Sequence, residues 1–199
     1  MKHLALFILI FFSSLSLFSQ TITSPGKKCS LRFALNANGE PTYRLSFGQK
    51  EVVKTSRMAV LLRDLPGFDK GFSIVRVDSS VTNETWEPVW GEVKTIRNNY
   101  KELAVTLRQA AADNRSFVIR FRLFDEGLGF RYEFPAQASL THFIVSDEIT
   151  EFALTGDHKT FWIPGDYDTN EYMYNTSSLS QVNGAVGGSA NEIHARTPI

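Results

Sequence analysis

Residues 119–134, IRFRLFDEGLGFRYEF, carry the pattern on which the fold prediction rests. Apolar residues alternate with arginine or glutamate on both sides of the segment DEGLG: Ile119, Phe121, Leu123, Phe130, Tyr132 and Phe134. Because successive side chains of a strand point to opposite faces of a sheet, this alternation indicates two half-buried antiparallel strands. DEGLG has the composition of the hairpin turn that would join them.

The same period of two recurs along most of the chain. Asn38-Gly39, between two alternating runs, is a strong hairpin signal. Residues 102–109 also allow a helical spacing, but their neighbours favour a strand. The predicted strands are residues 31–35, 43–47, 58–62, 72–77, 90–96, 102–109, 117–123, 130–134, 140–145 and 149–154. Many short strands separated by turns predict an all-β fold, a large antiparallel β-sandwich.

Residues 1–19 are predicted to be a secretory signal peptide. A short positive start, an unbroken apolar run and a small-residue segment follow one another in MKHLALFILIFFSSLSLFSQ. Cleavage near Ser19 or Gln20 would leave residues 20–199 as one exported domain, and a retained membrane anchor is the alternative. The cysteine of a lipoprotein signal is missing, since Cys29 is the single cysteine of the chain.

Charge and cysteine content exclude several classes of function. Loss of the signal leaves 20 basic and 21 acidic residues, a net charge of −1. Such a surface does not attract nucleic acid or anionic lipid over long distances, so we expect neither as a partner. One cysteine forms no internal disulfide and no thiolate metal cluster, and Cys29 is expected to be a small buried side chain.

Residues 155–176, TGDHKTFWIPGDYDTNEYMYNT, carry the main candidate for chemistry. Glycine and proline break the segment, so most of it is predicted to be loop. Its carboxylates and aromatic rings suit a hard-cation site, a sugar-binding wall, or a packed connection with polar caps. An EF-hand is excluded because Glu171 stands where that loop needs glycine. Signatures of hydrolases with a nucleophilic serine, of zinc proteases and of nucleotide-binding loops do not occur.

Residues 84–92, ETWEPVWGE, form a second unusual block. Trp86 and Trp90 are four residues apart and would face the same side of an extended strand. We expect a pair of core indoles here in preference to a ligand platform.

Three blocks in this order resemble the amino-terminal domain of glycoside hydrolase family 97: ETWEPVWGE, IRFRLFDEGLGFRYEFP and ITEFALTGDHKTFWIPGDYDTNEY. Members of that family are bacterial exo-acting α-glycosidases, retaining or inverting. The resemblance covers roughly residues 23–183. It implies a galactose-mutarotase-like β-supersandwich in an exported, periplasmic or secreted enzyme, and the sandwich is expected to be truncated at its carboxy-terminal end.

The resemblance also implies what this chain does and does not supply. Family members carry the catalytic acid and base on a (β/α)₈ barrel, so no catalytic residue is expected here. A glutamate of the amino-terminal domain joins barrel glutamates on a calcium ion, and Glu171 is the position we match to it, with Glu192 as the rival. Trp162, Asp168 and Asn170 are the expected contacts to the oligosaccharide substrate. A free-standing carbohydrate-binding β-sandwich and a structural domain remain as alternatives.

Overall fold

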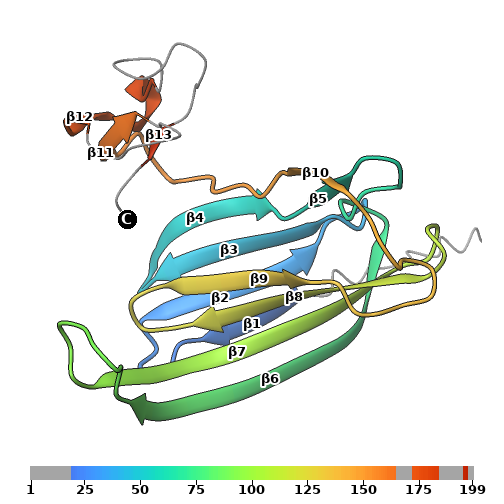
Figure 1. The fold of residues 1–199 in the computed structure, drawn as a ribbon, viewed down its shortest axis with the longest axis horizontal. Coiled ribbons are helices and arrows are strands. Elements are labelled where there is room, and N and C mark those ends of the chain that lie inside the picture. Colours follow the sequence, from blue (N-terminus) through green and yellow to red (C-terminus); the bar gives the residue numbers. More distant parts are fainter. Residues whose placement is uncertain (1–18, 165–171, 184–194, 197–199) are drawn as a thin grey trace, which may run out of the picture. The chain divides into compact units, whose positions relative to one another are not determined.

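The computed structural model describes residues 19–164, 172–183 and 195–196, and Figure 1 shows them as an all-β chain. The chain divides into two compact units, Met1–Ala153 and Leu154–Ile199, which are described separately. No helix among the described residues is long and apolar enough to cross a membrane. The predicted signal peptide lies outside the described residues except for Ser19, which begins the first strand.

The first unit begins with a four-stranded antiparallel sheet in chain order. Its strands are β1 (Ser19–Thr23), β2 (Cys29–Leu35), β3 (Pro41–Phe47) and β4 (Lys50–Arg57). The predicted hairpin at Asn38-Gly39 joins β2 to β3, and the Gly39 N–H donates to the carbonyl of Asn36. Gly39 adopts φ +70°, which explains why a glycine stands in this turn.

The second sheet has four longer antiparallel strands, again in chain order. They are β6 (Phe72–Trp86), β7 (Ile96–Gln109), β8 (Arg115–Leu123) and β9 (Leu128–Glu133). The interpretation of residues 102–109 as strand is confirmed, since all of them belong to β7. The turn predicted at DEGLG joins β8 to β9, closed by a 2.9 Å hydrogen bond from the Phe124 N–H to the Gly127 carbonyl.

The core of the first unit lies between these two sheets. Phe33 of β2 packs on Phe121 of β8 with ring centroids 5.9 Å apart, and Tyr43 of β3 lies 6.4 Å from Phe130 of β9. The alternating apolar residues of β8 face this core, and Phe117, Ile119, Phe121 and Leu123 are fully buried. The predicted antiparallel sandwich is confirmed.

Two predicted strands near the end of the first unit are wrong. In place of strands at residues 140–145 and 149–154, one short strand, β10 (Val145–Glu148), pairs with β5 (Val60–Leu62). Residues 149–153 run beside β4 but form only separate hydrogen bonds, such as the Glu151 N–H to the Arg57 carbonyl at 2.9 Å. The apolar pattern places residues 149–153 beside β4, but they do not form the continuous backbone hydrogen bonds of a strand.

The prediction for residues 90–96 is also wrong, except for Ile96. Residues 87–95 are the loop that joins β6 to β7, because β6 ends at Trp86 and β7 begins at Ile96. Trp86 is 50% exposed and Trp90 is 89% exposed, so they are not the core indoles that the sequence suggested.

The second unit holds a small antiparallel sheet in the order β12-β11-β13. Its strands are β11 (Lys159–Pro164), β12 (Asn175–Ser178) and β13 (Ala195–Arg196), and a short 3-10 helix, η1 (Leu179–Gln181), follows β12. The prediction that residues 155–176 are mostly loop must therefore be corrected for β11. Its residues KTFWIP alternate in burial up to Trp162 and end at Pro164.

Candidate functional site

Most of the predicted ligand residues fall outside the part of the chain that the structure describes. These are the substrate contacts Asp168 and Asn170, the calcium ligand Glu171 and its rival Glu192. In the described ranges, no three histidine, cysteine, aspartate or glutamate side chains come together as a metal site. The calcium site therefore stays a prediction.

Trp162 is the predicted substrate contact that the structure does describe. It is 4% exposed, and its indole N–H donates to the Ser177 hydroxyl oxygen at 3.0 Å. Phe161, its neighbour on β11, points to the other face and is 52% exposed, with the Lys159 ammonium 5.2 Å from its ring centroid. Alternation along a strand separates these two rings. A role for Trp162 in sugar binding stays a prediction. Of the two rings, Phe161 is the one exposed to solvent.

The strands that border residues 165–171 are held together by several contacts. Trp162 on β11 is opposite Asn175 on β12, so the two sides of that segment are neighbours in one sheet. The Asp157 carboxylate accepts hydrogen bonds from the backbone N–H and the hydroxyl of Ser180, at 2.7 and 2.8 Å. These bonds lower the pKa of Asp157, which stays ionised and anchors η1 next to β11.

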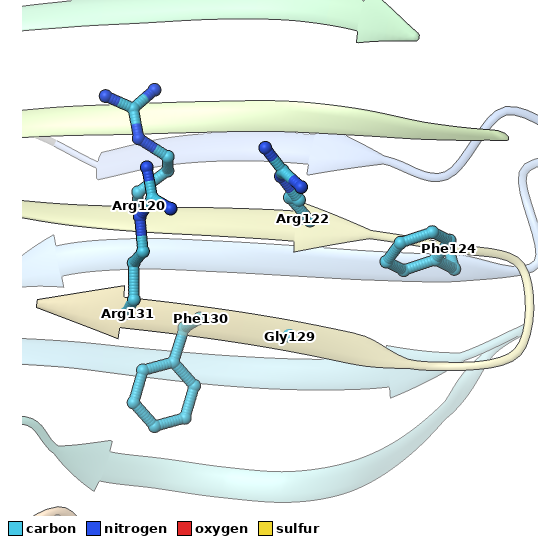
Figure 2. A pocket seen from close by; sticks show the side chains of 6 residues that line it. All are labelled: Arg120, Arg122, Phe124, Gly129, Phe130 and Arg131. Carbon is cyan, nitrogen blue, oxygen red and sulfur yellow. The ribbon is translucent and has the colours of Figure 1, made fainter. Parts of the chain in front are cut away.

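A second candidate lies in the first unit, on the face of β8 and β9 that points away from the core. A hollow of about 190 Å³ lies there, lined by Arg120, Arg122, Phe124, Gly129, Phe130 and Arg131. Figure 2 shows these residues, with the Phe130 ring pointing away from the arginine side chains. Gly129 is opposite Arg122 in the β8–β9 register, and a Cβ added to it would meet nothing within 4 Å. Because Gly129 has no side chain, the space above its backbone stays open between the arginine side chains.

Two glutamates neutralise most of the charge around this hollow. Arg120 bonds to both Glu102 and Glu133, while Arg122 bonds to Glu102 at 2.9 Å and Arg131 to Glu133 at 2.6 Å. Burial alone would raise the pKa of Glu102, but the hydrogen bonds from Arg122 and Arg120 outweigh it and lower that pKa. The hydrogen bond from Arg120, together with that from Arg131, lowers the pKa of Glu133 to about 2.

This arrangement is suited to holding structure together and not to acid–base chemistry. A general acid or base needs a pKa near the working pH, and both carboxylates are shifted away from it. Sequence reasoning noted the arginines of these strands but missed their partners. A hairpin closed at DEGLG predicts that Arg120 lies opposite Arg131, as it does in the structure, and like charges in that position are destabilising unless carboxylates lie beside them.

Comparison with known proteins shows the family of the chain. Residues 22–199 match the family described as Glycosyl-hydrolase 97 N-terminal. This chain belongs to glycoside hydrolase family 97. The resemblance carried by the three sequence blocks is thereby confirmed, and the match places the chain in the amino-terminal region of the family.

Solved family 97 enzymes share the fold. A Glycoside Hydrolase Family 97 enzyme from Pseudoalteromonas sp. strain K8, in complex with panose, is 32% identical with a TM-score of 0.76, covering 81% of this chain and 25% of that one. A family 97 enzyme from the same strain in complex with acarbose is also 32% identical, with a TM-score of 0.75, covering 80% of this chain and 24% of that one.

A more distant likeness is limited to the fold. A β-arabinopyranosidase is 19% identical with a TM-score of 0.66, covering 74% of this chain and 23% of that chain. This chain thus spans about a quarter of the length of the family 97 enzymes that it matches, 25% in the panose complex.

Proposed function

We propose that this chain is the amino-terminal β-sandwich domain of an exported, exo-acting α-glycosidase that hydrolyses oligosaccharides. The observation that carries the proposal is the match of residues 22–199 to the family's amino-terminal region, with a fold shared with an enzyme solved in complex with panose. In this proposal the catalytic acid and base lie on a barrel outside residues 1–199. The domain supports the mouth of that barrel, and residues 1–19 direct export.

We further propose that Glu171 is this domain's ligand to a calcium ion beside the substrate. Calcium takes six to eight oxygen ligands, so a lone carboxylate binds it weakly and the other ligands must come from outside this domain. The paired strands β11 and β12 support the proposal because they border residues 165–171 on both sides. Asp168 and Asn170 of that segment, together with Trp162 on β11, are the proposed substrate contacts.

The test of the main proposal uses the intact gene product. We expect the intact protein to hydrolyse panose or a p-nitrophenyl α-glycoside, and a protein ending at Ile199 to show no turnover. Turnover by the shorter protein would place the acid and base within residues 20–199 and contradict the proposal. An intact protein that binds oligosaccharides without cleaving them would favour a carbohydrate-binding module.

The calcium assignment is tested by substitution in the intact enzyme. Removing one carboxylate leaves the other ligands to hold the ion, so Glu171→Gln should raise the calcium concentration that gives half-maximal activity. Asp166→Asn removes a carboxylate of the same segment that has no proposed ligand role, so it is the matched control and should have a smaller effect. Calcium affinity, measured by isothermal titration calorimetry, should fall in parallel. If Glu171→Gln titrates like the wild type and Glu192→Gln does not, the ligand is Glu192.

A further inference from the structure

The hairpin of β6 and β7 extends beyond the sheet to which it belongs. β8 pairs with β7 only as far as Lys101, which is opposite Leu123. In the described part of the chain, residues 83–86 and 96–99 therefore pair with each other alone. Figure 1 shows this ribbon and its loop at the end of the sandwich where β8 turns into β9. Beyond Lys101, β7 lacks the neighbour β8 that covers the rest of the strand, which leaves that side of the ribbon open to a further packing partner.

The end of this ribbon is apolar. We call residues 86–93, WEPVWGEV, the hairpin tip. Trp86 and Trp90 are 50% and 89% exposed, Val93 is 58% exposed, and Val89 is fully exposed. Contiguous exposed apolar side chains of this kind mark interaction sites, and tryptophan is enriched among the residues that contribute most to binding.

Two acidic residues, Glu87 and Glu92, lie among these apolar residues, and Lys94 follows them in the chain. Glu87 and Glu92 are both exposed, and neither forms an ion pair with any residue that the structure describes. An apolar centre with a charged rim is the usual arrangement of a protein interface. The complementary surface is an apolar groove with lysine or arginine at its edge.

We propose that the hairpin tip docks into such a groove on the part of the same enzyme that lies outside residues 1–199. The chain matches only 25% of the length of the panose-bound enzyme, so most of a family 97 enzyme is available as the partner. A groove on the same polypeptide meets the tip at high effective concentration, which lets a small contact be stable. The inference rests on the proposed function only in requiring that the intact protein continues into that larger part.

Two other occupants fit the tip less well. A second copy of the chain would have to form a dimer, and a stable dimer needs about 20–30 residues on each side, far more than the tip supplies. A sugar ligand would need polar groups beside the aromatic faces to hold its hydroxyls. Glu87 and Glu92 supply polar groups beside the indoles, so displacement by panose is the arm of the experiment that separates a sugar from an apolar partner. The exposed side chains of Val89 and Val93 favour the apolar partner.

Photo-crosslinking of the intact protein tests the proposal. Val89→Cys can be labelled with benzophenone maleimide, because the native Cys29 is buried at 3% exposure and burial raises the pKa of its thiol. We expect crosslinks from position 89 to peptides outside residues 1–199 of the same molecule. Gln49→Cys, at the exposed β3–β4 turn, is the matched control for non-specific labelling. A mixture of isotope-labelled and unlabelled protein separates crosslinks within one molecule from those between copies.

Three outcomes overturn the proposal: crosslinks between copies, crosslinks confined to residues 1–199, or crosslinks that panose displaces. Hydroxyl-radical oxidation of the wild-type protein gives a second measurement that needs no variant. Trp90 should be oxidised several-fold more slowly in the intact protein than in the same protein unfolded in urea. Oxidation at the unfolded rate overturns the docking. Panose hydrolysis by the same samples keeps the two proposals apart, since protection without activity contradicts the proposed function alone.

Discussion

The two halves of β7 differ in how many neighbouring strands they have and in how deeply their side chains are buried. Residues 101–109 lie between β6 and β8, and their inward side chains Leu103, Val105 and Leu107 are buried. Residues 96–99 have β6 as their only strand neighbour in the described chain and lead away from the hairpin tip. The comparison teaches that burial in this domain depends on which element lies alongside a residue. Apolar character alone does not produce it.

The largest expected effect is on the buried side of this comparison. Phe117 is fully buried, with its ring centroid 4.9 Å from that of Phe68 and 5.4 Å from that of Tyr132. Phe117→Ala leaves a cavity and should lower the free energy of unfolding by about 3–5 kcal/mol. Native-state hydrogen exchange at the β7 and β8 amides measures this loss within the intact protein. Phe47→Ala, at a ring on β3 that is 54% exposed, is the control and should change protection of those amides by less than about 1 kcal/mol.

Two glycines give the next comparison. An alanine Cβ at Gly39 would lie 2.7 Å from the backbone nitrogen of Phe72, and φ is +70° there. Gly91, in the hairpin tip, has φ +142° but open space around it. Gly39→Ala should cost more than about 2 kcal/mol, because the clash adds to the backbone strain, and Gly91→Ala only about 1 kcal/mol. Urea unfolding followed by circular dichroism compares them, and equal costs would mean that the β2–β3 turn can shift.

The sandwich could be predicted because its sequence signals are local. Alternation in residues 117–123 and 130–134, and the turns at Asn38-Gly39 and DEGLG, each depend on neighbours a few positions away. All of them appear in the structure, except that β9 runs from Leu128 to Glu133 and so begins within DEGLG and ends before Phe134. The family resemblance predicted that the sandwich is the amino-terminal domain of family 97, and the match over residues 22–199 confirms it.

The errors arise where a long-range partner decides the outcome. Trp86 and Trp90 have the residue type of a core, but Trp86 ends β6 and Trp90 lies in the loop that follows, and no described element covers either ring enough to bury it. Residues 149–153 have an apolar pattern, but they meet β4 through scattered hydrogen bonds that no local signal specifies. In the candidate site, adjacent residues of β11 face opposite sides, and Trp162 is the buried ring while Phe161 is the exposed one. No local signal specifies which of the two sides packs.

A smaller effect is expected from the ion pairs that Glu102 and Glu133 form with the arginines of β8 and β9, on the face of that sheet that points away from the core. The pKa of Glu133 is about 2 in the folded protein against an ordinary 4.5, so the folded state favours the ionised form. This stabilisation is fully present above about pH 4.5 and is lost as the pH falls toward 2. Glu133→Gln should lower stability at pH 7 by about 1 kcal/mol, since the pair is partly solvated. It should also flatten the decline of the urea midpoint between pH 5 and 3, and an unchanged slope would contradict the assignment.

The smallest effect is expected at an ion pair on β6, at the edge of the same sheet. The Arg76 Nε lies 2.7 Å from Asp78 Oδ2, a distance like those around Arg120, but the two side chains are 71% and 49% exposed. Water screens such a pair, and holding two long side chains in place costs entropy, so Asp78→Asn should change stability by less than about 0.5 kcal/mol. Repeating the measurement in 1 M salt supplies the control, because screening removes most of what remains. A loss as large as that of Glu133→Gln would mean that another element covers β6 in the intact protein. That result would extend the proposed docking surface from the hairpin tip along the strand that carries it.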